Sequence, residues 1–440
     1  MQNQGIRDAR SLGTPKMLVL GLQHMFAMFG ATVLVPALTG LSVSATLLFA
    51  GLGTLFFHFL TKGKVPAFLG SSFAYLAGYA AIAPNGETAL LPYACVGVAA
   101  SGLLYLILSA LVRGFGANRV MRFFPPVVTG PIIICIGMTL ANSAINNCTG
   151  SWDIALVAII TVVVFNIWGK GMLRIIPILL GVLVSYVYAA ITGRVDFSGV
   201  ASAAWIGLPV KMENTVFSLI GNCDMNLLVT AVIAIMPIAF ATMIEHIGDI
   251  CAISSTVGEN FIADPGLHRT LLGDGLATTI ASLFGAPANT TYGENTGVLA
   301  LSKIYDPLVI RIAAVLAIIL SFSPKFEAVI NTIPTGIIGG ISFVLYGMIS
   351  AIGVRNVVEN RVDFTNSRNL IIAAVILVSA LGFNSVGGLT FAVAGVSINL
   401  SGLAIAAIVG ILLNAILPGN DYEFDSADGA DAPSSGNLQV

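Results

Sequence analysis

Fourteen apolar segments, each about as long as a membrane-spanning helix, follow one another along the 440 residues of the chain. A bilayer core about 30 Å thick takes roughly 20 apolar residues per helix. Only 9% of the residues are charged, against about a quarter in soluble proteins. The chain is therefore expected to be an all-α polytopic membrane protein, with segments near residues 17–36, 44–61, 65–84, 90–112, 124–143, 152–169, 173–192, 227–248, 268–285, 287–302, 306–323, 327–351, 368–386 and 397–417.

The basic residues fall mainly on one side of this arrangement. Of the 19 Lys and Arg, all but Arg194, Lys211 and Lys325 lie in loops on the side of the N-terminus. The positive-inside rule makes that side cytoplasmic. We expect a multi-pass protein of the cytoplasmic membrane with both termini inside, divided into an N-terminal stretch (1–16), seven segments (17–192), an external connection (193–226), seven segments (227–418) and an acidic, disordered cytoplasmic tail (419–440).

The two sets of seven segments show signs of a repeat. Pro126-Val127-Val128-Thr129-Gly130 opens the fifth segment of the first half, and Pro334-Thr335-Gly336 marks the fifth of the second. The third segment of each half is interrupted by Pro, Gly, Ser or Asn. Because seven is odd, successive halves cross the membrane in opposite directions, the inverted-repeat plan of secondary transporters. Chance similarity of Gly- and Pro-rich helices is the alternative.

Several classes of function find no support in the sequence. A net charge of −2 without a basic block gives no reason to expect nucleic-acid binding. The five Cys have neither C-x-x-C spacing nor an even count. No nucleophile–base pattern, metal-ligand spacing or phosphate loop is present. We therefore expect no enzyme activity, no catalytic residue, no metal and no cofactor.

Four acidic residues lie at membrane depth, where ionisable groups are costly and are functional candidates. They are Glu245, Asp249, Asp274 and Glu294. Glu245 and Asp249 are four residues apart and share one helix face. A carboxyl group able to hold a proton there suits a proton-coupled carrier. Asp249 could instead mark the cytoplasmic end of its helix, and Asp274 could serve in helix packing; His246 points about 100° away from Glu245 and is expected to pack.

The two interrupted segments indicate a site between them. Pro, Gly, Thr and Asn disfavour a continuous helix through 66–75 and 285–297. Non-helical backbone at this depth lines a cavity or is buried in protein. Two half-helix N-termini there would present N–H donors, and Glu245 and Glu294 would supply acceptors. Such a mixture matches a flat, uncharged heterocycle such as a nucleobase, with Phe73 or Tyr346 over its ring faces.

These residues resemble a known family, the nucleobase–ascorbate transporters, also called the nucleobase:cation symporter-2 family. The resemblance runs from about residue 21 to 417 and is greatest to the uracil-type members. The motifs that carry it are Gln23-His24-Met25-Phe26-Ala27-Met28-Phe29-Gly30-Ala31-Thr32, Gly70-Ser71-Ser72-Phe73, Glu245-His246-Ile247-Gly248, Asp264-Pro265-Gly266-Leu267-His268-Arg269 and Asn289-Thr290-Thr291-Tyr292-Gly293-Glu294-Asn295-Thr296-Gly297.

The resemblance implies two inverted repeats of seven segments, with short strands in segments 3 and 10. It implies a core domain (segments 1–4 and 8–11) moving like an elevator against a gate domain (segments 5–7 and 12–14), in a homodimer within the lipid bilayer. Glu245 and Glu294 would bind a nucleobase, uracil first, with the backbone of Phe73 and Gly293. Ala31 would line the pocket and Tyr346 would belong to the gate. Three carboxyl groups, those of Glu294, Asp249 and Glu245, are the candidates for coupling to a proton.

Two departures keep alternatives open. Uracil-type members have Gly-His after the Glu-His pair, whereas Gly248-Asp249 here is similar to the purine and ascorbate branches. Purine-type members usually have Gln at the position of Glu294. The sequence thus favours a proton-coupled uracil importer and leaves a purine permease for xanthine or urate, or a sodium-driven carrier or channel, as alternatives.

Overall fold

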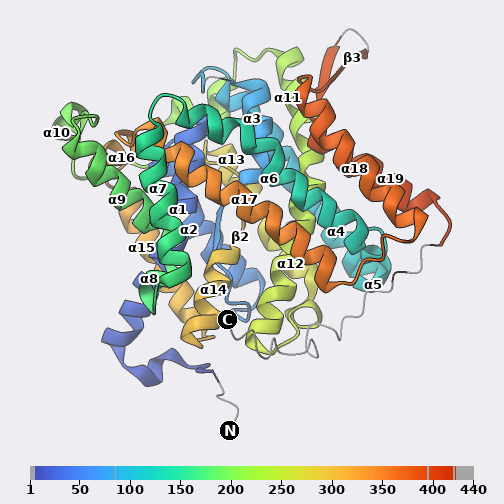
Figure 1. The fold of residues 1–440 in the computed structure, drawn as a ribbon, viewed down its shortest axis with the longest axis horizontal. Coiled ribbons are helices and arrows are strands. Elements are labelled where there is room, and N and C mark those ends of the chain that lie inside the picture. Colours follow the sequence, from blue (N-terminus) through green and yellow to red (C-terminus); the bar gives the residue numbers. More distant parts are fainter. Residues whose placement is uncertain (1–4, 85, 394–395, 420–421, 423–440) are drawn as a thin grey trace.

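The computed structural model describes residues 5–84, 86–393, 396–419 and 422, which form a bundle of helices with two short strand pairs (Figure 1). Most of the acidic tail expected at 419–440 lies outside the described residues. The first half contains η1 (Ala9–Leu12), α1 (Thr14–Thr39), α2 (Val43–Leu60), β1 (Leu69–Ser71), η2 (Phe73–Tyr75), α3 (Leu76–Ile82), α4 (Leu91–Phe115), α5 (Ala117–Met121), α6 (Pro126–Cys148), α7 (Trp152–Trp168), α8 (Met172–Ile175) and α9 (Pro177–Ile191).

A connection with three short turns leads to the second half. The turns are α10 (Ser198–Ser202), η3 (Met212–Asn214) and η4 (Val216–Leu219). The second half contains α11 (Met225–Ile235), η5 (Met236–Ile238), α12 (Ala239–Val257), η6 (Ile262–Gly266), α13 (Leu267–Leu283), β2 (Asn289–Thr291), α14 (Gly293–Ser302), α15 (Pro307–Ser321), α16 (Pro324–Asn331), α17 (Thr335–Glu359), α18 (Ser367–Ser385), β3 (Leu389–Val393), β4 (Val396–Leu400) and α19 (Gly402–Ile416).

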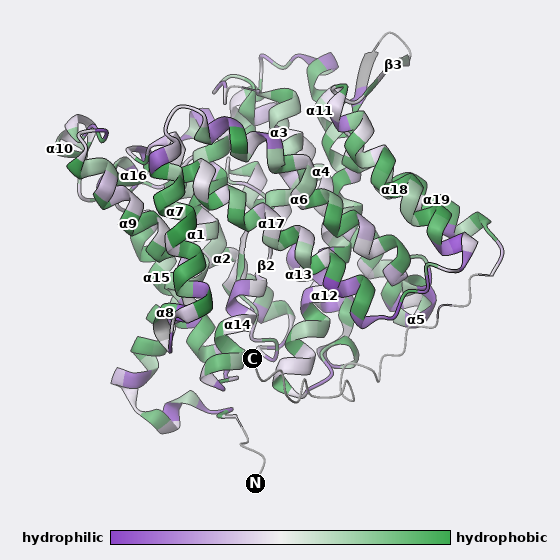
Figure 2. Cartoon of the chain, viewed as in Figure 1, coloured by the Kyte–Doolittle hydropathy of each residue, from purple (hydrophilic) through white to green (hydrophobic). Residues whose placement is uncertain are grey.

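Several helices have the length and composition of membrane spans. Within the described residues, seven meet both criteria: α1, α2, α4, α6, the continuous run Met225–Val257, α17 and α18. A further pair, α15 and α16, meets them together across an 87° bend, and four shorter apolar helices accompany these. Apolar residues predominate along the helices of the bundle (Figure 2). The chain is a multi-pass membrane protein.

The twelfth and the fourteenth expected segments differ in position from the observed helices. The twelfth was expected at 327–351, but α17 begins at Thr335 and continues to Glu359. Pro334 before it has extended backbone (φ −60°, ψ 146°) and cannot continue α16. The fourteenth was expected at 397–417, but its first residues form β4, and α19 begins at Gly402 after the Ser401 side chain caps its first turn.

The helices form two groups that contact one another. In the first group, α2 packs on α15, α4 packs on α13, and α1 packs on α15. In the second group, α6 packs on α17 and α18, α17 packs on α7, α7 packs on α9, and α18 packs on α19. When segments are matched by their order in the two halves, the α2–α15 contact corresponds to α13–α4, and α7–α9 corresponds to α18–α19. The pairing pattern therefore repeats between the halves.

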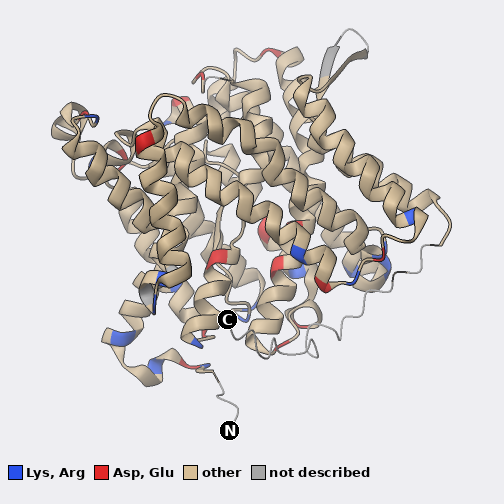
Figure 3. Ribbon diagram, in the orientation of Figure 1, with Lys and Arg blue, Asp and Glu red and all other residues tan. Residues whose placement is uncertain are grey.

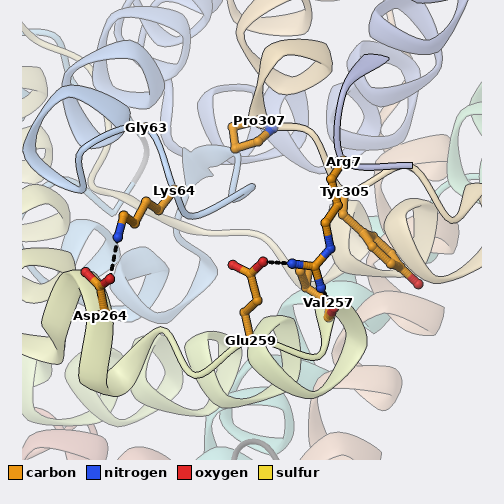
Figure 4. A pocket seen from close by; sticks show the side chains of 8 residues that line it. All are labelled: Arg7, Gly63, Lys64, Val257, Glu259, Asp264, Tyr305 and Pro307. Atoms are coloured by element: carbon orange, nitrogen blue, oxygen red, sulfur yellow. Dashed lines mark hydrogen bonds and ion pairs between the residues drawn. The ribbon is translucent and has the colours of Figure 1, made fainter. Parts of the chain in front are cut away.

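Charged residues lie mainly towards the two ends of the bundle, and most Lys and Arg gather at the end where the N-terminal segment lies (Figure 3). A pocket of about 250 Å³ at that end contains two ion pairs, Arg7 with Glu259 and Lys64 with Asp264 (Figure 4). The Lys64 ammonium holds the pKa of Asp264 below its ordinary value. Because its charges are already paired with one another, this pocket is a structural contact that joins the N-terminal segment and the α2–β1 loop to the α12–α13 loop.

Candidate ligand-binding site

The centre of the first helix group is a two-stranded ribbon built from both halves of the chain. Strand β1 pairs antiparallel with β2, with Gly70 opposite Thr290. The pairing extends beyond the strands, because the Ser72 amide donates to Ala288 O (2.8 Å) and the Tyr292 amide donates to Phe68 O (3.0 Å). The short strands expected in the two interrupted segments are thus present and bonded to each other.

Tyr292 stabilises the ribbon from one face by hydrogen bonds to β1. Its hydroxyl donates to the Ser71 carbonyl at 2.9 Å and lies 3.1 Å from the Ser71 hydroxyl. The ring covers Gly70 so closely that a Cβ there would lie 2.5 Å from the ring atoms. Glycine is required at position 70 because any side chain would displace the Tyr292 ring.

We expect Tyr292→Phe to lower the stability of the protein by about 1–3 kcal/mol, because the buried Ser71 carbonyl loses its side-chain partner. The melting temperature of the purified protein measures this effect. Tyr305→Phe is the matched control, since the Tyr305 hydroxyl makes no hydrogen bond with the described residues. Equal melting temperatures for the two variants would contradict the structural role of Tyr292.

A short helix begins at one end of each strand. The η2 turn begins at Phe73 after β1, and α14 begins at Gly293 after β2. Neither N-terminus has a side-chain cap within the described structure. Free N–H groups at such ends are donors for a ligand. Gly293 is exposed and Phe73 is buried, so the α14 end is the more accessible one.

Three carboxylates gather beside the start of α14. Glu245 and Asp249 lie on α12 and Glu294 lies in the first turn of α14; all three are half-buried. The Thr291 hydroxyl donates to Asp249 at 2.8 Å, and a Cβ on Gly293 would lie 3.8 Å from the same carboxylate. Glu245 and Glu294 are close enough for their charges to repel. None of the three forms an ion pair with a Lys or Arg among the described residues.

The position of Asp249 excludes one alternative raised by the sequence. Helix α12 continues for eight residues beyond Asp249 to Val257, so this carboxylate does not mark a helix end. Helix α11 and α12 together extend further than the expected segment at 227–248. Asp249 therefore projects from within the helix towards the ribbon.

Behind these carboxylates lies a buried pair that sequence patterns did not bring together. His246 Nδ1 is 3.4 Å from Asp274 Oδ2, and both side chains are fully buried. Thr291 Oγ1 lies 3.4 Å from His246 Nδ1, and the Thr290 hydroxyl donates to Asp274 at 3.4 Å. The expectation that His246 packs rather than faces Glu245 is met. The pair connects α12 and α13 to β2.

A buried layer closes the other side of the site. The Phe73 and Tyr346 rings meet edge to face, with centroids 6.2 Å apart. Ala31 on α1 is 1% exposed and belongs to the same apolar cluster. From the site, α12 and α14 continue towards one end of the bundle (Figure 1). The N-terminal segment contacts that end, because Ile6 bridges to Ile304 just after α14.

The geometry defines a class of ligand. Carboxylate oxygens accept hydrogen bonds, and backbone N–H groups beside them donate, within a site closed by two aromatic rings. No group of three or more His, Cys, Asp or Glu in the described residues could hold a metal ion. The arrangement suits a small, flat molecule that has both N–H and C=O groups on its edge.

Comparison with known proteins identifies the class and the family. The model of the "Permease family" matches residues 15–388. A uracil permease of Bacillus caldolyticus is 43% identical over 425 residues, covering 94% of each chain, and one of Bacillus subtilis is 40% identical over 432 residues, covering 94% and 95%. The fold resembles the transmembrane domain of the cyanobacterial bicarbonate transporter BicA (TM-score 0.62, 14% identity, covering 94% of this chain and 100% of that one).

The family model and these relatives show a membrane transporter rather than an enzyme. The chain belongs to the permease family, as the resemblance in its motifs indicated.

Proposed function

We propose that this permease imports uracil across the cytoplasmic membrane by proton-coupled symport. The observation that carries the proposal is the cluster of Glu245, Asp249 and Glu294 beside the free N–H groups at Gly293. Carboxylates accept from the ring N–H groups of uracil, and backbone amides donate to its carbonyl groups. Further support comes from relatives that are named uracil permeases and match over nine-tenths of the chain.

The proposed binding mode uses both half-helices. Glu245 and Glu294 hold the base edge, the backbone at Phe73 and Gly293 contacts its carbonyl groups, and Ala31 lines the pocket. Support comes from the ribbon, which fixes the starts of η2 and α14 relative to each other. The edge-to-face contact of Phe73 with Tyr346 supports an aromatic wall for the base and a place for Tyr346 in the gate.

The proposed transport cycle moves the first helix group as a core against the second group as a gate, like an elevator. Fourteen segments in two inverted repeats of seven would give these two domains. The contact pattern that recurs between the halves favours this arrangement. The gathering of Lys and Arg at the N-terminal end favours placing both termini in the cytoplasm (Figure 3). The family resemblance also supports a homodimer.

We propose that Asp249 takes up the coupling proton and that Glu245 and Glu294 are its neighbouring carboxyl groups. Three carboxyl groups without a basic partner repel one another in a site of low dielectric. Uptake of a proton relieves that repulsion and lets the base approach. After the base is released to the cytoplasm, the proton is released to the same side.

We expect Asp249→Asn to lose accumulation of uracil against a gradient while retaining exchange of labelled for unlabelled base. Asn keeps an oxygen that accepts from Thr291 Oγ1 but cannot take up a proton. Uptake and counterflow in vesicles measure the two activities. Asp196→Asn, an exposed acidic residue in the connection between the halves, is the control. Undiminished accumulation in Asp249→Asn would assign coupling to another group.

The proposal is tested by uptake of labelled uracil and labelled xanthine into cells that lack their own carriers, with and without a protonophore. Saturable uracil uptake that collapses with the proton gradient supports it. Uptake of xanthine alone favours the purine permease, for which Gly248-Asp249 is the observation. Uptake that survives the protonophore and requires sodium favours a sodium-driven carrier.

A further inference from the structure

A second cavity lies at the opposite end of the bundle from the N-terminal segment. Its volume is about 440 Å³, within the range of roughly 300–1,000 Å³ that small-molecule sites occupy. Thr39 at the end of α1 and Ala81 on α3 line one wall. Ser143 on α6 and Asn384 on α18 line the other. The cavity thus lies between the two helix groups that enclose the carboxylate site.

A layer of apolar side chains separates this cavity from the carboxylates. Leu76 on α3 and Leu140 on α6 form part of the cavity wall. Both belong to the same buried cluster as Phe73 and Tyr346. A molecule in the cavity therefore lies on the far side of the Phe73–Tyr346 contact from Glu294.

The chemistry of the cavity differs from that of the carboxylate site. None of the described residues that line it is charged. The Asn384 side chain donates to the Thr139 carbonyl at 3.2 Å, which fixes the amide against α6. One turn further along α6, the side chain of Ser143 is exposed. Amide and hydroxyl groups set among Leu and Ala suit a small polar molecule without charge, and they exclude an ion that would need a charged partner.

We propose that this cavity is a second, outer binding subsite for an uncharged nucleobase. The inference rests on the proposed function, because it takes the same class of ligand to both sites. A base bound here stays on the outer side of the Phe73–Tyr346 layer until the two helix groups move relative to each other. Since no titratable acid lines the subsite, binding to it is independent of pH and of Glu294.

Equilibrium binding of labelled uracil to the purified full-length protein tests the proposal. We expect about two bound molecules per chain in the wild type and about one in Glu294→Ala. Ser143→Trp fills the outer cavity and should also bind about one, whereas Asn142→Trp is the matched control, since Asn142 is the exposed neighbour on α6 and does not line the cavity. The double variant Glu294→Ala, Ser143→Trp should bind none.

A smaller substitution provides a second test in case Ser143→Trp does not fold. Asn384→Leu removes the amide while keeping the number and branching of the side-chain heavy atoms, and it should weaken the outer binding step by about 10-fold. One bound uracil in the wild type, lost in Glu294→Ala and unaffected by Ser143→Trp and Asn384→Leu, would overturn the outer subsite and leave the proposed function intact. Binding that Glu294→Ala leaves unchanged at both steps would overturn the role of Glu294 in the proposed function, and the Ser143→Trp variant would then test the outer subsite separately.

Discussion

Glu294→Gln should lower the affinity for uracil by about 10- to 150-fold, because a hydrogen bond to a charged group contributes about 1.5–3 kcal/mol. Gln keeps the shape of the side chain and one acceptor oxygen, but it loses the negative charge that accepts from the ring N–H groups of the base. The substitution also removes the repulsion between Glu294 and Glu245. The pH dependence of uptake should therefore change together with the affinity. Concentration-dependent uptake at several pH values measures both.

Glu359→Gln is the matched control for this prediction. Glu359 lies at the end of α17, where its side chain is 66% exposed and pairs with Arg355 one turn earlier. Exposed pairs of this kind contribute about 0–1 kcal/mol, so uptake should stay at the wild-type level. If Glu294→Gln takes up uracil with unchanged affinity and unchanged pH dependence, Glu294 does not hold the base or the proton.

Gly137→Leu should prevent the second helix group from packing. A Cβ at Gly137 on α6 would lie 2.1 Å from the Tyr346 carbonyl oxygen and 3.0 Å from the Ser350 amide on α17. Both are backbone atoms, which move only if the whole helix moves. Small residues at crossings of membrane helices allow this close approach. We expect a loss of about 3 kcal/mol of stability, the upper end of the usual cost of overpacking, measured as a lowered melting temperature or as absence of folded protein after purification.

Gly382→Leu separates this effect from the general cost of altering a glycine in a helix. Gly382 is an exposed position of α18, and a Cβ there would have no atom within 4 Å. Its replacement should leave the melting temperature unchanged or raise it slightly, since Leu favours helix more than Gly does. A similar fall in both variants would mean that the α6–α17 crossing does not depend on Gly137.

The general architecture could be predicted from the sequence because membrane depth constrains it. The length of the apolar segments indicated the helices, and the interruptions by Pro and Gly indicated non-helical backbone within 66–75 and 285–297. That this backbone forms short strands, observed at 69–71 and 289–291, was implied by the family resemblance. The boundaries of α17 were harder to predict, because apolar residues such as Val329 and Ile330 also occur before Pro334, in the less apolar helix α16. The β3–β4 hairpin was missed for a similar reason, because its residues read as the start of an apolar segment.

The carboxylates of the site could be predicted because acids are rare in apolar segments. Glu245, Asp249 and Glu294 were found in this way, and the structure brings them together. The register of the ribbon and the contact between His246 and Asp274 could not be predicted, since they depend on how segments distant in the sequence pack. The sequence does contain an indication that Asp274 is buried, because it lies between Gly273 and Gly275. The absence of side chains at these two positions lets α13 approach its neighbouring helices closely.

The ribbon of β1 and β2 also sets the order in which the site can be assembled. Leu69 pairs with Thr291, so 222 residues separate the partners along the chain. Until synthesis has passed β2, the first half has an unpaired strand and a half-helix with no counterpart. A ligand therefore cannot assist the folding of the first half alone. Any nascent chain that stops before residue 289 lacks Glu294 as well as the partner strand.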